Sequence, residues 1–115
     1  MKKMPVLFFG HGSPINVLDK ENPFNQNLSL ITQKFAKPKA ILMISEHWYS
    51  SGLQVTSGEH PEMIYDFYGF PEELSQAQYP APGSPELAEQ VSSVLQPENV
   101  GLHPTRGLHH GTWAV

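Results

Sequence analysis

The chain has no cysteine among its 115 residues. Disulfides, thiolate-based zinc sites and cysteine nucleophiles are therefore excluded as sources of stability or chemistry. A sequence without cysteine is compatible with a reducing compartment, and we expect a cytoplasmic protein.

Long hydrophobic runs and clusters of basic residues are also missing. The apolar stretch at residues 6–9 is too short for the core of a signal peptide, and no run approaches the length that spans a membrane. The seven Lys and Arg residues are scattered and the net charge is -4, which argues against a nucleic-acid surface. We expect neither nucleic acid nor membrane as a partner.

A hydrophobic share of 39% is enough for one domain with one core. Apolar runs at residues 5–10 and 40–45 lack a helical period, and they predict two buried strands. Between them, residues 25–36 place Leu28, Ile31 and Phe35 on one helical face. This order predicts a βαβ unit with parallel strands and an α/β fold.

The second half of the chain predicts further elements. Residues 53–56 alternate in polarity and residues 100–103 are apolar at their start, so both are expected strands. Residues 58–83 are rich in Gly, Pro and aromatics and predict a long ordered loop. Ser84, Pro85 and Glu86 are typical of a helix start, and that helix should end before Pro97. Its apolar stripe is expected to comprise Leu87, Val91, Val94 and Leu95.

Two histidines directly follow the two predicted buried strands. His11 lies between Gly10 and Gly12, and His47 follows Ser45 and Glu46. Ligands of open α/β sheets bind beyond the carboxyl ends of parallel strands, so the two imidazoles are expected to converge there. Such a pair suits Fe(II), Zn(II), Cu(II) or Ni(II), but a catalytic centre needs a third ligand and open positions. On spacing alone, two hydrogen-bonded loop histidines remain an equal alternative.

The other histidines and the aromatic residues are weaker candidates. Adjacent histidines do not both face one point in a regular element, so at most one of His109 and His110 should enter a site. We expect His109 to be exposed or to lie behind the site, and His60 and His103 to lie in surface loops. The aromatics at residues 65–70 fit either the wall of a pocket for a flat ring or a small core of the loop itself.

Five segments, read in order, carry a family resemblance. They are Gly10-His11-Gly12-Ser13-Pro14, Ser45-Glu46-His47-Trp48, Asp66-Phe67-Tyr68-Gly69-Phe70-Pro71, Tyr79-Pro80-Ala81-Pro82-Gly83 and His110-Gly111-Thr112-Trp113. Together they resemble the class III extradiol dioxygenases, in the DOPA-dioxygenase branch related to LigB-type ring-cleaving enzymes. The resemblance extends over nearly the whole chain, from residue 5 to residue 115.

The resemblance implies a specific site and reaction. His11 and His47 would bind the metal, and His110 would line the active site and assist substrate binding or proton transfer. The expected metal is non-haem Fe(II), with Zn(II) as a replacement, and the expected reaction opens the ring of a catechol such as DOPA with O2. The family often has Ala where Glu46 stands, His where Tyr65 stands and Asp where His109 stands, and these departures leave the substrate preference open.

The resemblance also implies a fold and an extent. The fold would be a three-layer α/β sandwich with a mostly parallel central sheet, and residues 1–115 would be the N-terminal part of a single catalytic domain. A third metal ligand and a further catalytic histidine would then come from a C-terminal half. A sheet cut in this way exposes an edge strand and apolar surface, so we expect self-association.

Two other functions compete with the dioxygenase. Tetrapyrrole metal chelatases also place a His-Gly-Ser sequence after a first buried strand, although the segments around His47 and Tyr79 favour the dioxygenase. The chain could instead be a catalytically incomplete fragment that binds a metal ion through His11 and His47.

Overall fold

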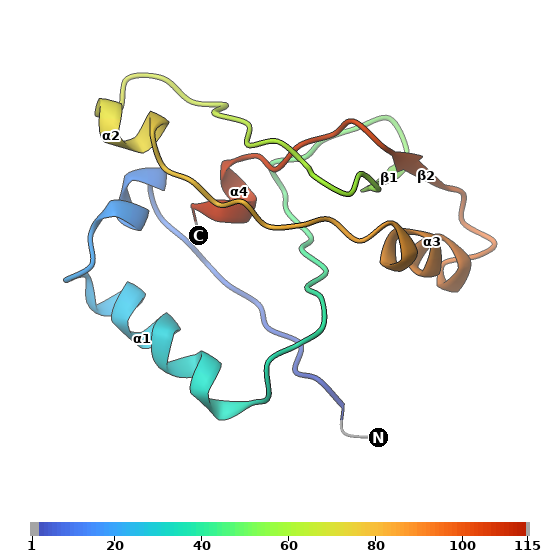
Figure 1. Cartoon of the computed structure of the whole chain (residues 1–115), viewed down its shortest axis with the longest axis horizontal. Coiled ribbons are helices and arrows are strands. Elements are labelled where there is room, and N and C mark those ends of the chain that lie inside the picture. Colours follow the sequence, from blue (N-terminus) through green and yellow to red (C-terminus); the bar gives the residue numbers. More distant parts are fainter. Residues whose placement is uncertain (1–2, 115) are drawn as a thin grey trace.

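The computed structural model describes residues 3–114. Short helices and two strands are distributed along this part of the chain, with long irregular segments between them (Figure 1). In order, the elements are η1 (Pro14–Leu18), α1 (Pro23–Ile31), η2 (Thr32–Lys34), β1 (Leu53–Thr56), α2 (Glu72–Ser75), α3 (Pro85–Val94), β2 (Val100–His103) and α4 (His110–Trp113). Within residues 3–114 no helix has the length and apolar character needed to cross a membrane.

The regular part of the fold is a parallel βαβ unit. β1 and β2 pair in parallel, with Leu53 opposite Val100 and Thr56 opposite His103, and α3 lies between them in sequence. The strands predicted at residues 53–56 and 100–103 are therefore confirmed, as is a mixed helix and strand fold with parallel pairing. The larger central sheet between two helical layers stays a prediction.

Helix α3 begins as the sequence predicts. The Ser84 side chain accepts a hydrogen bond from the Leu87 backbone N–H at 3.3 Å, and Pro85 occupies the first helical position. The predicted apolar stripe is wrong at its end, because Val94 is 80% exposed and Ala88 is the buried residue of this helix. Ser92 in the last turn still contacts β2, because its hydroxyl donates to the Val100 carbonyl at 3.3 Å, whereas Val94 points to solvent.

The predicted strands at residues 5–10 and 40–45 are absent. Both segments are irregular in the described structure, and their side chains are open to solvent, with Val6 98% and Phe8 99% exposed. A strand forms only where a neighbour pairs with its backbone, and the described residues place no strand beside either segment. The βαβ unit predicted for the first 45 residues is thus wrong, since the unit that forms is the one around α3.

The helix predicted at residues 25–36 is confirmed with shifted ends. α1 begins at Pro23, where the Asn22 side chain accepts a hydrogen bond from the Phe24 backbone N–H at 2.9 Å. It ends at Ile31 and continues as the short 3-10 turn η2. The helical face predicted from Leu28, Ile31 and Phe35 is half-buried.

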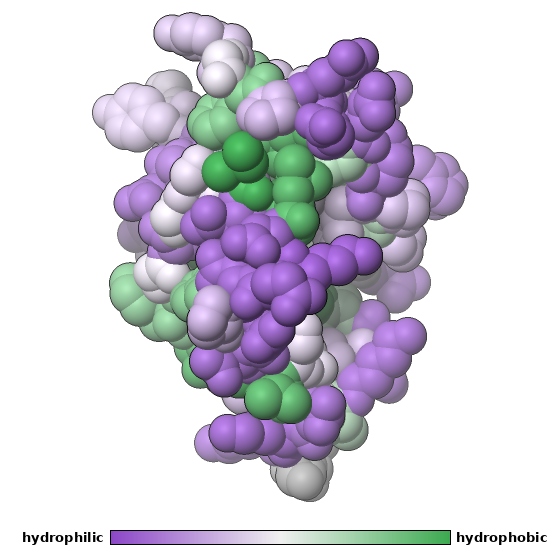
Figure 2. Space-filling view, turned by 90° about the vertical axis from the view of Figure 1, so that its left-hand side faces the viewer, coloured by the Kyte–Doolittle hydropathy of each residue, from purple (hydrophilic) through white to green (hydrophobic). Residues whose placement is uncertain are grey.

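A small hydrophobic core joins the long loop to the last helix. Leu74 of α2 is fully buried against Trp113 and Ala114, and Phe67 and Phe70 pack around them. The Phe67 ring lies 5.8 Å from the Trp113 ring and 5.6 Å from the Phe70 ring, measured between centroids. The loop at residues 58–83 therefore contains a short helix, and Phe67 and Phe70 belong to the loop's own core. On the face turned toward the viewer in Figure 2, polar residues dominate and apolar residues form separate patches.

We predict that Leu74→Ala lowers the free energy of unfolding by about 2–4 kcal/mol, because Leu74 is fully buried and its truncation leaves a cavity in the core. The matched control is Leu30→Ala, since Leu30 is also helical but 54% exposed. Urea unfolding followed by circular dichroism measures both. Equal effects of the two substitutions would show that Leu74 does not anchor this core.

Candidate metal centre

His11 lies in the irregular stretch just before η1. Its Nδ1 atom is 3.1 Å from the carbonyl oxygen of Gly12. A neutral imidazole that donates its Nδ1–H to this carbonyl keeps the lone pair of Nε2 free for a metal ion. The local backbone thus fixes both the orientation of the ring and the tautomer that a ligand needs.

His47 is presented by a tight turn at residues 45–48. The Trp48 backbone N–H donates to the Ser45 carbonyl at 3.4 Å, and the His47 backbone N–H donates to the Ser45 hydroxyl at 3.2 Å. Trp48 anchors the turn, because Arg106 lies 5.1 Å above its ring and His103 packs against its edge. Glu46 and His47, the central residues of the turn, point to the same side.

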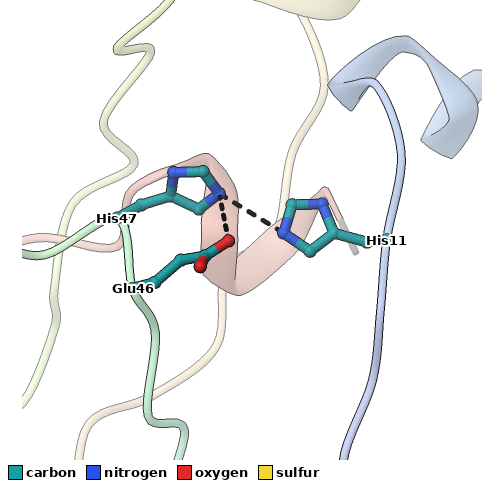
Figure 3. Close-up of side chains that lie close together, drawn as sticks. All are labelled: His11, Glu46 and His47. Atoms are coloured by element: carbon teal, nitrogen blue, oxygen red, sulfur yellow. Dashed lines mark hydrogen bonds and ion pairs between the residues drawn. The ribbon is translucent and has the colours of Figure 1, made fainter.

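The two predicted histidines meet although 36 positions separate them in the chain (Figure 3). Their Nε2 atoms are 3.3 Å apart. Metal–ligand bonds of about 2.0–2.2 Å place neighbouring ligand atoms roughly 3 Å apart, so this separation suits two adjacent positions around one ion. The Oε1 atom of Glu46 is 4.0 Å from Nε2 of His47, and the three ligand atoms lie within 4.8 Å of one another.

Helix α4 packs directly against His47. A Cβ atom on Gly111 would come within 2.8 Å of Cδ2 of His47 and would also meet the Ser45 hydroxyl. Only glycine allows this approach without displacing the turn that carries His47. The centroid of the His110 ring lies 4.3 Å from that of His47, so α4 brings a third imidazole to the pair.

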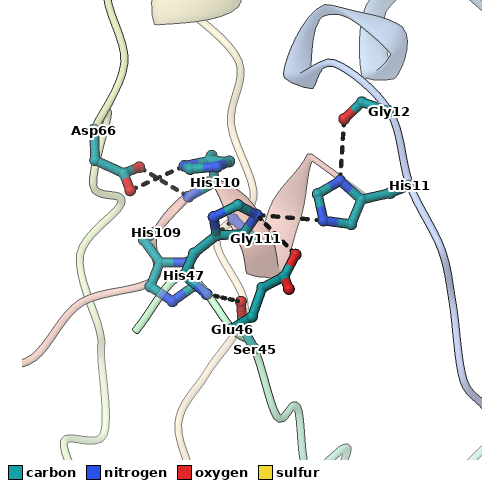
Figure 4. Close-up of polar contacts among 9 residues, drawn as sticks. All are labelled: His11, Gly12, Ser45, Glu46, His47, Asp66, His109, His110 and Gly111. Atoms are coloured by element: carbon teal, nitrogen blue, oxygen red, sulfur yellow. Dashed lines mark hydrogen bonds and ion pairs between the residues drawn. The ribbon is translucent and has the colours of Figure 1, made fainter. Parts of the chain in front are cut away.

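Asp66 holds His110 in place through two contacts (Figure 4). The carboxylate accepts the His110 backbone N–H at 3.0 Å through Oδ1, and Oδ2 lies 2.9 Å from Nδ1 of the ring. Burial alone raises the pKa of Asp66, but the contacts with His110 outweigh burial and hold the pKa below its ordinary value. The carboxylate is therefore ionised beside an imidazole that it can stabilise in the protonated form.

His109 is buried, with only 3% of its surface exposed, so of its two expected placements it takes the one behind the site. Its Nδ1 atom accepts the Gly111 backbone N–H at 3.1 Å and caps α4. Burial, aided by the nearby positive charge of Arg106, lowers the pKa of His109 despite the opposing effect of Asp66. His109 is thus a neutral residue that stabilises the start of α4 and does not enter the site.

The remaining histidines lie outside the group. His60 is exposed in a bend, as expected. His103 is not in a surface loop, because it is the last residue of β2, half-buried against Trp48.

Residues 6–114 match the family described as the catalytic LigB subunit of aromatic ring-opening dioxygenase. The chain belongs to this family. It is 43% identical over 114 residues to the 4,5-DOPA dioxygenase extradiol of Escherichia coli (strain K12), covering 98% of this chain and 42% of that protein. It is 40% identical over 111 residues to the 4,5-DOPA dioxygenase extradiol of Beta vulgaris, covering 92% of this chain and 41% of that protein. The chain thus spans less than half the length of these relatives.

Three residues at this LigB-family site were not singled out from the sequence as site residues: Glu46, Asp66 and Gly111. All three lie inside the recognised segments, but no spacing rule links Asp66 to His110, 44 positions later. Glu46 is adjacent to His47, and adjacent side chains share one side only because residues 45–48 form a turn. Gly111 follows His110, yet its contact with His47 depends on how α4 packs.

We predict that the free energy of unfolding falls as the pH drops below 6.5, in part through His109. Its pKa is lowered in the folded chain from an ordinary value of 6.5, so the unfolded chain binds more protons in acid. His109→Asn keeps a side chain that can cap α4 but cannot titrate, and it should lessen this loss. Urea unfolding of both proteins at pH 7.5 and pH 5.5 measures the difference. An unchanged dependence on pH would show that His109 does not contribute.

Proposed function

We propose that this chain supplies His11 and His47 to the non-haem Fe(II) centre of an extradiol dioxygenase that opens a catechol ring, such as that of DOPA, with O2. The observation that carries the proposal is the 3.3 Å separation of the two Nε2 atoms. Membership of the LigB family and the similarity to enzymes named 4,5-DOPA dioxygenase extradiol support it. The family match gives no such support to a tetrapyrrole chelatase.

Residues 1–115 would form the N-terminal part of one catalytic domain with a three-layer α/β architecture. The exposed apolar segments that lead to His11 and His47 support this proposal, because they have the composition of buried strands. The same exposed side chains, with Val6 and Phe8 almost fully accessible, support self-association of the chain in isolation.

The donors fit the metal. Two neutral imidazoles suit Fe(II), and they also suit Zn(II) as a replacement. When bound, Fe(II) would lower the pKa of the catechol hydroxyls and mediate electron transfer from the ring to O2. His11 and His47 would hold the ion, and the Gly12 carbonyl and the Ser45 turn would keep their rings oriented.

His110 would hold or move a proton at the reacting edge of the substrate. Its ring lies beside that of His47, while its Nδ1 atom faces the Asp66 carboxylate. The negative charge of Asp66 would stabilise the imidazolium that forms when Nε2 of His110 takes a proton from a catechol hydroxyl.

A pocket next to His11 offers a place for the rest of the substrate. It has a volume of about 530 Å³ and is lined in part by Val17, Lys20 and Phe24. The apolar side chains would cover the flat ring, and the ammonium group of Lys20 would attract an acidic substituent such as the carboxylate of DOPA.

The proposal is tested in a chimera, in which residues 6–114 of this chain replace the matching segment of the Escherichia coli relative. After anaerobic loading with Fe(II), we expect the chimera to consume O2 when L-DOPA is added. His11→Ala and His47→Ala should each abolish iron retention and O2 uptake, whereas His60→Ala, at an exposed bend, should change neither. Normal turnover in either of the first two variants would refute their assignment as ligands.

His110→Ala in the same chimera should retain iron but slow turnover by about 10²-fold or more, the usual loss when a general acid or base is removed. Iron content by elemental analysis and the rate of O2 uptake separate the two effects. Loss of iron in this variant would instead make His110 a ligand.

A further inference from the structure

We propose that Arg106 is a positioning residue of the metal centre: its guanidinium group holds the Trp48 ring, and through that ring it keeps the turn that carries His47 directed toward His11. The inference rests on the metal site proposed above and adds to it a residue that acts through its neighbour.

The turn at residues 45–48 is weakly fixed by its own backbone. Its closing hydrogen bond, from the Trp48 N–H to the Ser45 carbonyl, is 3.4 Å long, which is beyond the usual range of about 2.7–3.2 Å. The segment before the turn pairs with no strand among the described residues. His47 is exposed within the turn, whereas Trp48 is half-buried at its end. The packing of Trp48 is therefore a main constraint on where the turn holds the His47 imidazole.

Arg106 belongs to a segment whose position is fixed independently of this turn. The residues after it pair with the long loop, because the Leu108 N–H donates to the Glu62 carbonyl at 2.7 Å and the Ile64 N–H donates to the Leu108 carbonyl at 2.8 Å. Gly107 is buried against the Glu62 carbonyl, where a Cβ atom would collide with the backbone, so this approach requires glycine. The backbone beside Arg106 is thus a firm support from which the side chain can hold the turn.

The contact between Arg106 and Trp48 is a cation–π interaction. The guanidinium carbon lies 5.1 Å from the centre of the Trp48 ring, and the His103 ring packs against the same indole in a T-shaped arrangement. Arg106 is half-buried, and its Nε atom is buried without a hydrogen-bond partner among residues 3–114. A guanidinium group is weakly hydrated and stacks on aromatic faces, so the Trp48 ring offsets part of the cost of this burial.

The positive charge of Arg106 gives the proposal a distinctive sign. Like charges repel, so if Arg106 acted on the metal centre only through its charge, its removal would strengthen the binding of a metal ion. If Arg106 holds the turn, its removal frees the turn, and bringing His47 to His11 then costs additional conformational entropy. Metal binding weakens in that case. Removing a group that orients a metal ligand typically costs about 10–100-fold in affinity.

The test titrates the chain and its variants with Ni(II), an ion that suits imidazole ligands, by isothermal calorimetry. We expect the Kd to rise about ten-fold in Arg106→Met, which keeps a long side chain and removes its cation. Arg106→Lys keeps a cation for the ring and should recover part of the lost affinity. Lys34→Met removes an exposed positive charge of η2, and Ala88→Gly destabilises the buried side of α3; both controls should leave the Kd unchanged. Circular dichroism checks that each variant folds, and Arg106→Gln replaces Arg106→Met if that variant does not.

A double-mutant cycle shows whether Arg106 acts through Trp48. The cycle is needed because the charge of Arg106 also helps to lower the pKa of His109, which is a second route to the site. Trp48→Leu alone should raise the Kd about as much as Arg106→Met does. In the Trp48→Leu background, Arg106→Met should raise it no further, and a second ten-fold rise there would overturn the proposed route.

The outcomes separate this inference from the function proposed above. If His11→Ala and His47→Ala lose Ni(II) while Arg106→Met binds it with an unchanged or lower Kd, the two-histidine site stands and the role of Arg106 is overturned. An equal rise of the Kd in Ala88→Gly would overturn that role as well, because the loss would then follow stability. If the unmodified chain binds Ni(II) no better than His11→Ala and His47→Ala do, the proposed ligands are refuted, and the role of Arg106 with them.

Discussion

The approach of His11 to His47 is the contact on which the site depends. Two neutral imidazoles can share at most one hydrogen between facing Nε2 atoms, so the pair at 3.3 Å is weakly bonded by itself. It is held from outside, by the Gly12 carbonyl behind His11, by the Ser45 turn behind His47 and by Gly111 against the His47 ring. An ion between the rings would use both lone pairs at once.

Two groups near this pair, Asp66 and His109, differ in charge. The Asp66 carboxylate is kept ionised by His110, whereas burial keeps His109 neutral. One side of the site therefore carries a negative charge that can support a protonated imidazole. The neutral His109 lies behind His47, where a positive charge would repel a bound cation. The two adjacent histidines thus have different surroundings, because His109 is buried and His110 contacts the Asp66 carboxylate.

Local signals in the sequence predicted local structure well. The start of α3 follows from Ser84 and Pro85, and the convergence of His11 and His47 was expected from residues that follow two apolar runs. The two apolar runs were predicted as strands, but both are irregular. Apolar composition indicates that a segment tends to be buried, whereas a strand also needs a neighbouring strand to pair with. Asp66 was missed as the partner of His110 for a related reason, since a contact over 44 positions depends on tertiary packing.

The exposed segments and the histidines at their ends are energetically linked. Neither segment pairs with a strand among the described residues. Holding the two imidazoles together therefore costs conformational entropy, and no backbone hydrogen bonds of a sheet compensate for that cost. An ion that binds both rings ties the two segments at their carboxyl ends and stabilises the conformation that contains the site. A strand that paired with these two segments would also bring His11 and His47 together, without the ion. Metal affinity and strand pairing should therefore reinforce each other, because each lowers the cost of ordering that the other has to meet.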